Sequence, residues 1–427
     1  MKEGKREGFS RRDFLAAGTA VGISGFPLLK TAKAQAAKPM RVGVLGTGGR
    51  GTGACADALA ADPSVELVAM ADLVPERIEA SLQSLSRNNA LAGEAARRIK
   101  VTDKTKFSGW DCYDKLLSAD VDYVILANPP GFRPRDFALA VERGKHIFAE
   151  KPLATDPVGV RKIKASAQQA KEKGLSVVVG LNYRHSKRIM ENVKRVRDGQ
   201  VGEIRSGYIH RLGGGLWHRG SDPSWTEMEY QCRNWYYFCW LSGDQIVEMV
   251  VHQIDQMNWL MGAYPISALA SGGRQVRVDP KYGNIYDHMD VDFEYPGGIH
   301  VFCMLRQWDG CTNKMDTVVI GSDGICDGKG ITGKNPWEPT EEESNPSIYE
   351  HWELIDSIRK GQPRNDALDF GADSTLACIM GRESAYTGKL VTWDEMLNSG
   401  LDLYPKDAKL GLAPQHPIPT PGQPRTA

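Results

Sequence analysis

Three side chains in the middle of the sequence have the types and spacing of acid–base chemistry. Lys151 lies in the run AEKPLA, directly after a predicted strand. Glu248 and His252 are four residues apart within Ser242 to Gly262, a segment with a helical pattern, so they project from one face. A carboxylate one turn away can tune an imidazole toward neutral pH. We expect the histidine to take a proton from a hydroxyl group and the lysine to orient the substrate or transfer a proton.

The same helical segment leaves other interpretations open. Asp255 adds a second carboxylate to the stripe, and two carboxylates with one histidine have the types of zinc ligands, but no further His or Cys follows at metal-ligand spacing. We therefore expect no metal. A solvated ion pair is the commoner fate of a carboxylate and a histidine at this spacing. Ser242 and Gln245 predict a capping box at the start of the helix, and Gly262 predicts its end.

A glycine-rich turn predicts a dinucleotide site. Between a predicted strand and a predicted helix the sequence reads GTGGRG, which contains Gly46, Gly48, Gly49, Arg50 and Gly51. Such glycines permit a tight turn, a close approach of the backbone to a pyrophosphate, and close packing of helix and strand. Asp72 ends the next predicted strand, 21 residues past Gly51, where an acid accepts hydrogen bonds from a ribose 2′-OH and repels a 2′-phosphate. We expect NAD rather than NADP, a preference that Arg50 could soften; a turn without a nucleotide is the alternative.

The surrounding elements predict an α/β fold. From Met40 to Gly180, continuous runs of Val, Ile and Leu alternate with helical stretches, which predicts a doubly wound parallel sheet. Ligands of such sheets bind beyond the C-terminal ends of the strands, where Lys151 lies. Pro152 restricts the backbone beside this lysine and could be cis.

After Asn182 the pattern changes to that of a second, mixed α/β domain. Its long strands include 288–295 and 299–308, joined by a Pro-Gly-Gly hairpin turn, and they predict an open, largely antiparallel sheet. Segments 348–361 and 372–389 predict amphipathic helices that pack back onto the body. One face of an open sheet must be covered, either by helices of the same chain or by a second subunit.

The 427-residue chain divides into four parts. We expect a targeting segment at 1–37, a dinucleotide-binding domain at 38–182, a substrate and oligomerisation domain at 183–400, and a Pro-rich extended arm at 401–427. The targeting segment has a positive start, a weakly apolar run and small-residue cleavage sites, and its SRRDFL resembles a twin-arginine signal, whose substrates cross the membrane already folded. The pattern therefore predicts an exported, periplasmic protein.

Charge balance and cysteine spacing limit the partners. Lys and Arg number 53 and Asp and Glu number 53, so the chain lacks the basic field that attracts nucleic acid or anionic lipid. After the targeting segment no apolar run approaches the length of a membrane span. We expect a small-molecule ligand. The 8 cysteines show no C-x-x-C and no zinc spacing, and the sequence leaves their pairing open.

The ordered set of motifs resembles the Gfo/Idh/MocA family, the relatives of glucose-fructose oxidoreductase and inositol dehydrogenase. The resemblance covers about Lys38 to Trp393 and rests on the glycine loop, the acid after the second strand, the Glu-Lys-Pro run, and the helix with an acid four residues before a histidine. It implies an N-terminal Rossmann domain, a C-terminal α/β domain whose open sheet often mediates oligomerisation, and redox chemistry on sugars or polyols. Glu248 falls where relatives commonly have Asp, and Arg133 where they often have His.

The resemblance also implies roles for single residues. Lys151 would lie near nicotinamide and substrate and stabilise a developing oxyanion, and His252, tuned by Glu248, would be the general acid or base. The further expected cofactor residues are Asn128 and Glu150, and the expected substrate residues are Asn182, Arg184 and Trp235.

The expected function is that of an NAD-dependent oxidoreductase acting on a hydroxyl of a sugar, polyol or glycoside, in a homo-oligomer formed through the C-terminal sheet. Because no nicotinamide pool is expected outside the cytoplasm, an exported enzyme would hold NAD tightly and recycle it within the site. Two alternatives stay open: a glycoside hydrolase or lyase that uses NAD catalytically, and a non-catalytic, cofactor-bound sugar-binding protein.

Overall fold

Two sheets organise the part of the chain that the computed structural model describes, which comprises residues 38–88, 91, 93, 95–340, 344–415 and 417–423. The predicted targeting segment with its twin-arginine pattern lies outside these described residues.

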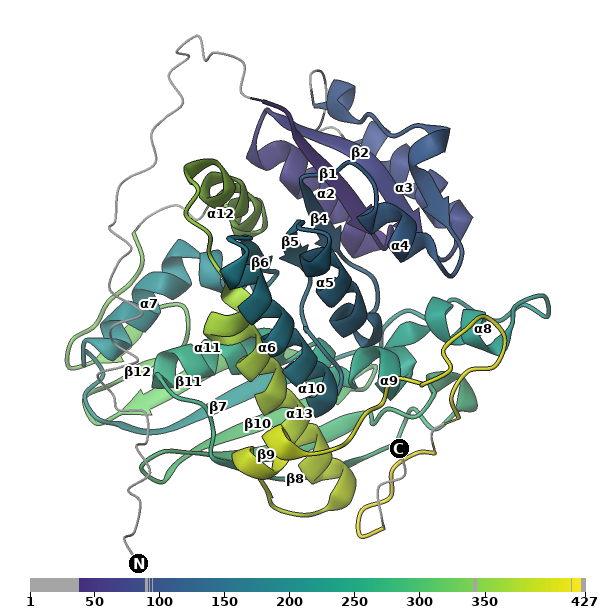
Figure 1. Ribbon diagram of the computed structural model, residues 1–427. Helices are drawn as coiled ribbons and strands as arrows, with labels where there is room; N and C mark the ends of the chain where they lie inside the picture. The colour runs from purple at the N-terminus through teal and green to yellow at the C-terminus, as the bar shows by residue number, and fades with distance from the viewer. Residues whose placement is uncertain are drawn as a thin grey trace, which may run out of the picture. The chain divides into compact units, whose positions relative to one another are not determined.

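Within this part, the first sheet has 6 parallel strands in the order β3-β2-β1-β4-β5-β6 (Figure 1). The strands are β1 (Met40–Leu45), β2 (Val65–Asp72), β3 (Lys106–Ser108), β4 (Tyr123–Leu126), β5 (His146–Ala149) and β6 (Val177–Val179). The order reverses between β1 and β4, which is where doubly wound sheets bind their ligands. The predicted doubly wound sheet is confirmed. The short, half-exposed β3 is an addition that no apolar run indicates.

Helices cover both faces of the first sheet. They are α2 (Gly49–Ala61), α3 (Pro75–Ser86), α4 (Cys112–Leu117), α5 (Arg133–Glu142), α6 (Pro157–Glu172) and α12 (Pro346–Lys360). In β4, Tyr123 belongs to one hydrophobic cluster and its neighbour Val124 to the other, because successive side chains of a strand point to opposite faces. α12 comes from late in the chain, yet it contacts α2, β5 and β6, and its Leu354 and Ile355 complete the cluster that holds Tyr123.

The second sheet has 8 strands among the described residues, in the order β13-β12-β11-β7-β10-β9-β8-β14. The strands are β7 (Ile204–Gly213), β8 (Ser267–Gly273), β9 (His288–Tyr295), β10 (Ile299–Gln307), β11 (Lys314–Gly321), β12 (Gly324–Cys326), β13 (Ile331–Gly333) and β14 (Val391–Thr392). Within this second sheet, β7 and β10 are the only described strands that pair in parallel. The predicted hairpin is confirmed, since Tyr295 faces Ile299 across a turn in which Gly297 and Gly298 have positive φ.

One face of the second sheet is covered and the other is open. α11 (Val251–Met261) contacts β7 and β11, and α13 (Ala372–Thr387) contacts β8 and β9 on the covered face (Figure 1). In β10, Val301, Cys303 and Leu305 are buried, whereas Phe302 and Met304 between them are exposed. The helices of the described residues therefore cover one face only.

The single helix predicted from Ser242 to Gly262 is wrong. The chain forms α9 (Cys239–Ser242), α10 (Gln245–Glu248) and α11, and Ser242 ends a helix rather than capping one. Asp244 interrupts the segment with φ 73°, and its buried carboxylate accepts hydrogen bonds from the backbone N–H of Gln245 and of Tyr286, and from the Tyr386 hydroxyl. These bonds hold a left-handed backbone that a non-glycine residue rarely adopts. As a result Glu248 ends one helix and His252 begins the next.

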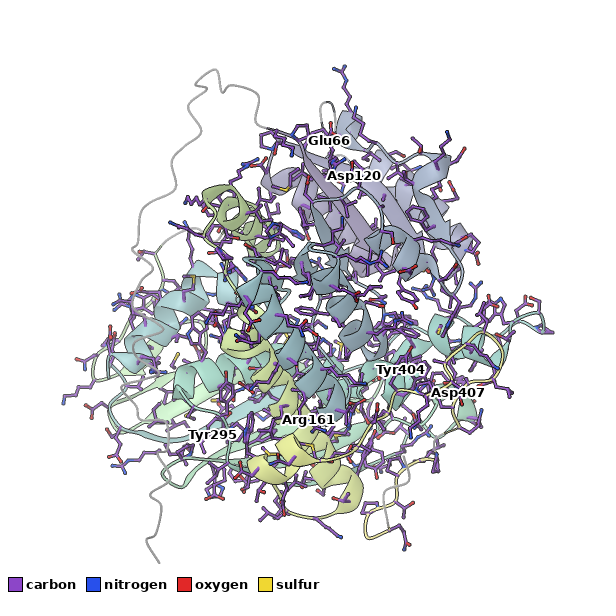
Figure 2. All side chains as sticks on the ribbon, viewed as in Figure 1. Glu66, Asp120, Arg161, Tyr295, Tyr404 and Asp407 are labelled. Atoms are coloured by element: carbon purple, nitrogen blue, oxygen red, sulfur yellow. The ribbon has the colours of Figure 1, made fainter. Side chains whose placement is uncertain are left out.

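The predicted arm runs from the body back across it without helix or strand among the described residues 401–415 and 417–423. Before it, α14 (Trp393–Asn398) is tied to α6 because Arg161 donates to the Leu397 and Ser399 carbonyls at 2.6 and 2.8 Å (Figure 2). In the arm, the Tyr404 hydroxyl accepts from Arg135 at 3.2 Å. The Gly411 carbonyl accepts from the backbone of α8 (Glu227–Arg233) at 3.1 Å. The arm therefore braces α8.

Three further observations concern the described residues alone. None of their helices has both the length and the apolar character that crossing a membrane requires. No group of three or more His, Cys, Asp or Glu side chains among them could hold a metal ion. All 8 cysteines are described as thiols, with Cys311 exposed and the others buried.

Candidate active site

The glycine loop is tightly packed at Gly46 and Gly51 and open at Gly48 and Gly49. Gly46 has φ 90°, and a Cβ there would lie 2.4 Å from the Asn128 backbone nitrogen. A Cβ on Gly51 would lie 1.8 Å from the Gly46 carbonyl oxygen, so helix and strand pack against each other as the motif predicts. Around Gly48 and Gly49 a Cβ would meet nothing within 4 Å. The open side of the loop at the N-terminus of α2 fits a pyrophosphate.

A pocket opens beside this loop. Its wall includes Gly48, Asp72 and Asn128 from the first sheet, and Cys232 and Trp235 from the second part of the chain. Trp235, which the sequence suggests as a substrate platform, therefore lines the pocket of the glycine loop.

Asp72 is fixed in the wall of this pocket. It is the last residue of β2, and its Oδ2 accepts from the Thr47 backbone N–H at 2.7 Å and from the Thr47 hydroxyl at 3.1 Å. Its Oδ1 accepts from the Val74 backbone N–H at 3.0 Å. A carboxylate oriented in this way at the end of the second strand fits the ribose hydroxyls of a dinucleotide.

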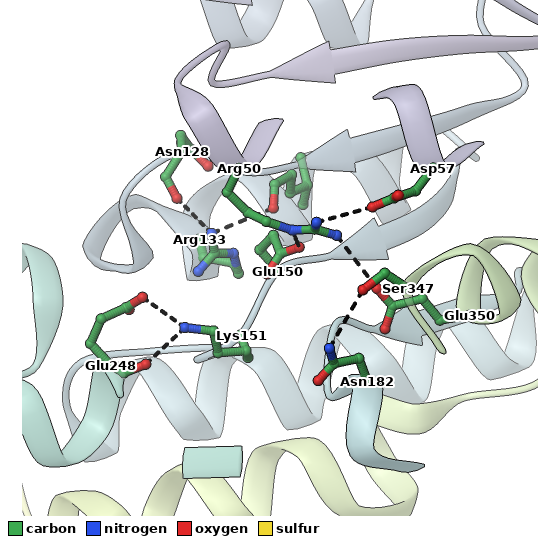
Figure 3. A network of polar contacts seen from close by, with 11 residues as sticks. Arg50, Asp57, Asn128, Arg133, Glu150, Lys151, Asn182, Glu248, Ser347 and Glu350 are labelled. Atoms are coloured by element: carbon green, nitrogen blue, oxygen red, sulfur yellow. Dashed lines mark hydrogen bonds and ion pairs between the residues drawn. The ribbon is translucent and has the colours of Figure 1, made fainter. Parts of the chain in front are cut away.

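Lys151 and Glu248 form a buried pair. The Lys151 Nζ donates to Glu248 Oε1 and to the Glu248 carbonyl oxygen, both at 2.8 Å (Figure 3). The Lys151–Pro152 bond is cis. Burial raises the pKa of Glu248, and the charge of Lys151 opposes this rise. The second oxygen, Oε2, is buried with no partner among the described residues, so it can accept a hydrogen bond from a ligand.

His252 lies in the first turn of α11 and is electrically neutral near pH 7. Burial lowers its pKa well below the usual value, and the positive charge of Lys151 lowers it further. The ring lies against Tyr183, with the ring centres 5.2 Å apart. The expectation that Glu248 tunes this imidazole is wrong, because the carboxylate of Glu248 turns to Lys151 instead. A neutral imidazole at this place can accept a proton.

Arg50 is held by three carboxylates, those of Glu150, Asp57 and Glu350. Its Nε donates to Glu150 at 2.5 Å, and its two terminal nitrogens lie 3.0 Å from Asp57 and 3.5 Å from Glu350 (Figure 3). Glu350 is contributed by α12, and burial raises its pKa well above the usual value, as does the nearby charge of Glu150. The sequence analysis predicts no role for Glu350, although an acid inside the apolar stripe of 348–361 is a signal of a buried ion pair.

Two family models match the chain. An oxidoreductase family with an NAD-binding Rossmann fold matches residues 40–181, and the GFO/IDH/MocA C-terminal domain matches residues 190–326. The chain belongs to the Gfo/Idh/MocA family. Its Rossmann domain is NAD-binding, and the open glycine loop and the fixed Asp72 fit that cofactor.

The chain is similar to dehydrogenases that are named for inositol and for levoglucosan. It is 27% identical over 252 residues to inositol 2-dehydrogenase of Rhizobium meliloti (strain 1021), which is 59% of this chain and 63% of that protein. It is 28% identical over 324 residues to levoglucosan dehydrogenase of Pseudarthrobacter phenanthrenivorans, which is 73% of this chain and 72% of that protein. The match to the inositol dehydrogenase thus spans less than two thirds of that relative's length.

The fold matches solved structures of the family. The structure of scyllo-inositol dehydrogenase from Lactobacillus casei with bound NAD(H) and scyllo-inositol superposes with a TM-score of 0.63. The superposition covers 84% of this chain and 100% of that chain at 18% identity. At this identity the similarity shows the fold alone.

Arg133, where many Gfo/Idh/MocA proteins are expected to have His, joins the two loops of the site. Its side chain is fully buried and donates to the Pro152 carbonyl at 2.6 Å and to the Asn128 carbonyl at 2.5 Å. Burial lowers the pKa of Arg133 to about 10. Asn128 donates to Asp136 at 2.6 Å, while its Oδ1 is buried with no partner among the described residues. The sequence signals this arginine only as a departure from the family pattern.

The candidate substrate residues of this Gfo/Idh/MocA protein differ in whether their polar groups already have hydrogen-bond partners. Arg184 makes two bonds to Asp255, at 2.8 and 2.9 Å, and stacks on Trp259, so its guanidinium is already engaged. The sequence analysis places Asp255 on one stripe with Glu248 and His252, but in the structure its carboxylate binds Arg184 instead. Asn182 donates to Ser347 at 3.5 Å, and its Oδ1 is buried with no partner within the described part of the chain.

Proposed function

We propose that this protein is an NAD-dependent oxidoreductase that acts on a hydroxyl group of a sugar, polyol or glycoside. The observation that carries the proposal is the Lys151–Glu248 pair at the end of β5, together with a neutral His252 whose pKa responds to the Lys151 charge. Parallel strands of this fold present their C-terminal ends to the ligand, and β5 is two strands away from the β1 that carries the glycine loop.

The residues divide the proton chemistry among them. An ammonium group has three N–H donors, and Glu248 takes two of those on Lys151, so one donor is left for the substrate oxygen. His252 accepts the hydroxyl proton because its imidazole is neutral. Bound NAD supplies the hydride acceptor. The positive charge of Lys151 stabilises negative charge that develops on the substrate oxygen.

Two buried acceptors support a ligand with several hydroxyl groups. Glu248 Oε2 and Asn182 Oδ1 are buried and have no partner among the described residues. A buried acceptor without a donor is costly, and the hydroxyls of a sugar or polyol are donors that would satisfy it. A ligand with a single hydroxyl would leave one of the two unsatisfied.

We infer that the cofactor is held tightly and reoxidised in place by a second substrate. The support is the enclosure of the nucleotide pocket by the segment around α8, which contributes Cys232 and Trp235 to the pocket wall. The α8 residue Arg233 bonds Glu76 of α3 at 2.7 Å, so the segment is tied to the first sheet's own helix. The twin-arginine pattern supports export with the cofactor already bound, because such signals serve folded proteins.

The open face of the second sheet supports assembly with a second copy of the chain. Phe302 is 58% exposed, Met304 46% and Leu269 52%, on strands whose other face is buried. Exposed apolar side chains grouped on one sheet face mark an interaction surface.

The deciding experiment uses the mature protein purified from the exported fraction. Bound nucleotide is released and identified, and the loaded protein is mixed with a panel of sugars, polyols and glycosides while NADH absorbance is followed. The proposal predicts stoichiometric NAD that one compound reduces and a second reoxidises. Release of an aglycone with no net reduction would point to redox-assisted glycoside cleavage. Binding of sugars without any reduction would overturn the enzymatic proposal.

A further inference from the structure

Arg211 lies in β7, and its positive charge acts on the imidazole of His252. Alternate residues of a strand share one face, so Gly207, Ile209 and Arg211 lie together. A Cβ on Gly207 would lie 3.0 Å from the methyl carbon of Met257, and Ile209 is buried, so this face of β7 packs against α11. Arg211 is the next residue along that face, toward the C-terminal end of the strand.

The start of α11 is fixed at the level of Arg211. The side-chain nitrogen of Gln253 donates to the carbonyls of His210 and Asp316, both at 2.9 Å. His252 precedes Gln253 and Arg211 follows His210, so both side chains lie at this end of the helix–strand contact. Burial dominates the lowered pKa of His252, and the charge of Arg211 contributes after that of Lys151. The guanidinium of Arg211 therefore acts on the imidazole.

Arg211 differs from Lys151 and Arg184 because it has no carboxylate partner among the described residues. Lys151 is paired with Glu248, and Arg184 with Asp255. The Arg211 guanidinium contacts the sulfur of Met315, a side chain that is 58% exposed. The nearest acid in the facing strand, Asp316, is on the other face and is bound by His210. No carboxylate among the described residues therefore neutralises the charge of Arg211.

We infer that Arg211 binds a carboxylate of the substrate, and that the substrate is an acidic sugar such as a uronic acid or its glycoside. The inference rests on the proposed function and names its substrate class. A guanidinium offers two parallel N–H donors that match a carboxylate, and the half-buried position of Arg211 beside an exposed methionine leaves it accessible.

The test compares two substrates that differ in one group, methyl glucuronide and methyl glucoside, in wild type and in Arg211→Gln. We expect Arg211→Gln to lose about 10- to 100-fold in kcat/KM for the acid, mainly through KM, and to show a clearly smaller loss for the neutral glycoside, which shares only the change of charge beside His252. Arg211→Lys keeps the charge without the fork and should lie between the two. Arg205→Gln on the same strand, where the arginine is paired with Glu203 at 2.9 Å, is the matched control.

Calorimetric binding of both glycosides to the NAD-loaded protein separates the inference from the proposed function. If no sugar reduces the cofactor but wild type binds the acid and Arg211→Gln does not, the proposed function fails and the carboxylate site stands. Equal losses for acid and neutral glycosides, or a wild-type preference for the neutral one, would overturn the inference. Thermal melting of each variant shows that the fold is intact.

Discussion

Lys151 is oriented by two acceptors of a single residue, the side-chain and backbone oxygens of Glu248. This arrangement fixes the ammonium but places a buried carboxylate where loss of the lysine would leave it without a counter-charge. Removing one member of such a pair costs more than the pair contributes, because the remaining charge stays desolvated. The lysine is therefore both an orienting group for substrate and a support for Glu248.

For Lys151→Met we expect kcat to fall by about 10² to 10⁴, since the donor to the developing oxyanion is lost. Single-turnover reduction of the bound cofactor measures this loss. Nucleotide content should stay stoichiometric, because the glycine loop is unchanged. A variant that loses its nucleotide and keeps its rate of reduction when resupplied would contradict the assigned role.

The pH dependence follows from the lowered pKa of His252. The base must be neutral to accept a proton, and it stays neutral as the pH falls until the lowered pKa is reached. The acid limb of kcat/KM should therefore lie below the ordinary histidine value of 6.5. A profile of kcat/KM between acidic and neutral pH tests this expectation, and an acid limb at or above 6.5 would exclude His252 as the base.

At the scale of elements, different glycines of the loop serve the packing of the helix on the strand and the binding of the cofactor. Gly51 serves the packing of α2 on β1, whereas Gly48 faces open space and has a φ of −66° that any residue can adopt. A methyl group should therefore act on the fold at one position and on the cofactor at the other.

We expect Gly48→Ala to leave the melting temperature of the nucleotide-free protein unchanged and to weaken NAD binding by about 10- to 100-fold, because the methyl group fills the pyrophosphate side. Gly51→Ala should destabilise the nucleotide-free protein by about 2 kcal/mol or more, since its Cβ would lie 1.8 Å from a carbonyl oxygen. Calorimetry and thermal melting of both variants measure the two effects. The opposite assignment of effects would contradict the loop geometry.

The elements that the sequence predicts well are those set by local apolar patterns. The run 65–72 and the run 288–295 coincide with β2 and β9, because continuous or alternating apolar residues determine a strand locally. The helix break at Asp244 could not be predicted, since two of its partners, Tyr286 and Tyr386, are distant in sequence. The same limit applies to the site: the types of Lys151 and Glu248 indicate chemistry, but their pairing depends on the tertiary fold.

At the scale of the whole molecule, the ion pair between Arg233 and Glu76 joins α8 to α3, and Cys232 beside Arg233 lines the cofactor pocket. Arg233→Gln should release bound NAD about 2- to 10-fold faster, because one half-exposed ion pair contributes up to about 1 kcal/mol. Dilution of the loaded protein into an NAD scavenger measures the release rate, with Arg205→Gln as control. An unchanged rate would show that α8 does not retain the cofactor.

Assembly through the open sheet face predicts a different result. Phe302→Asp places a charge in the middle of the exposed apolar face, and a charge that is buried in an interface without a partner costs free energy. We expect sedimentation to show dissociation of the oligomer, while Leu412→Asp in the exposed arm leaves it intact. A wild-type protein that sediments as a monomer would contradict the proposed assembly.

The position of α12 affects the order in which the protein can be made. Leu354 and Ile355 complete the core on one face of the first sheet, and Glu350 completes the carboxylate set around Arg50. All three leave the ribosome after every strand of the first sheet and every strand of the second sheet except β14 has been translated. One face of the first sheet therefore stays partly uncovered until nearly the whole chain has been synthesised. A chaperone that shields apolar surface would act longest on this uncovered face. A chain truncated after the first sheet would lack the α12 residues that complete the carboxylate set around Arg50.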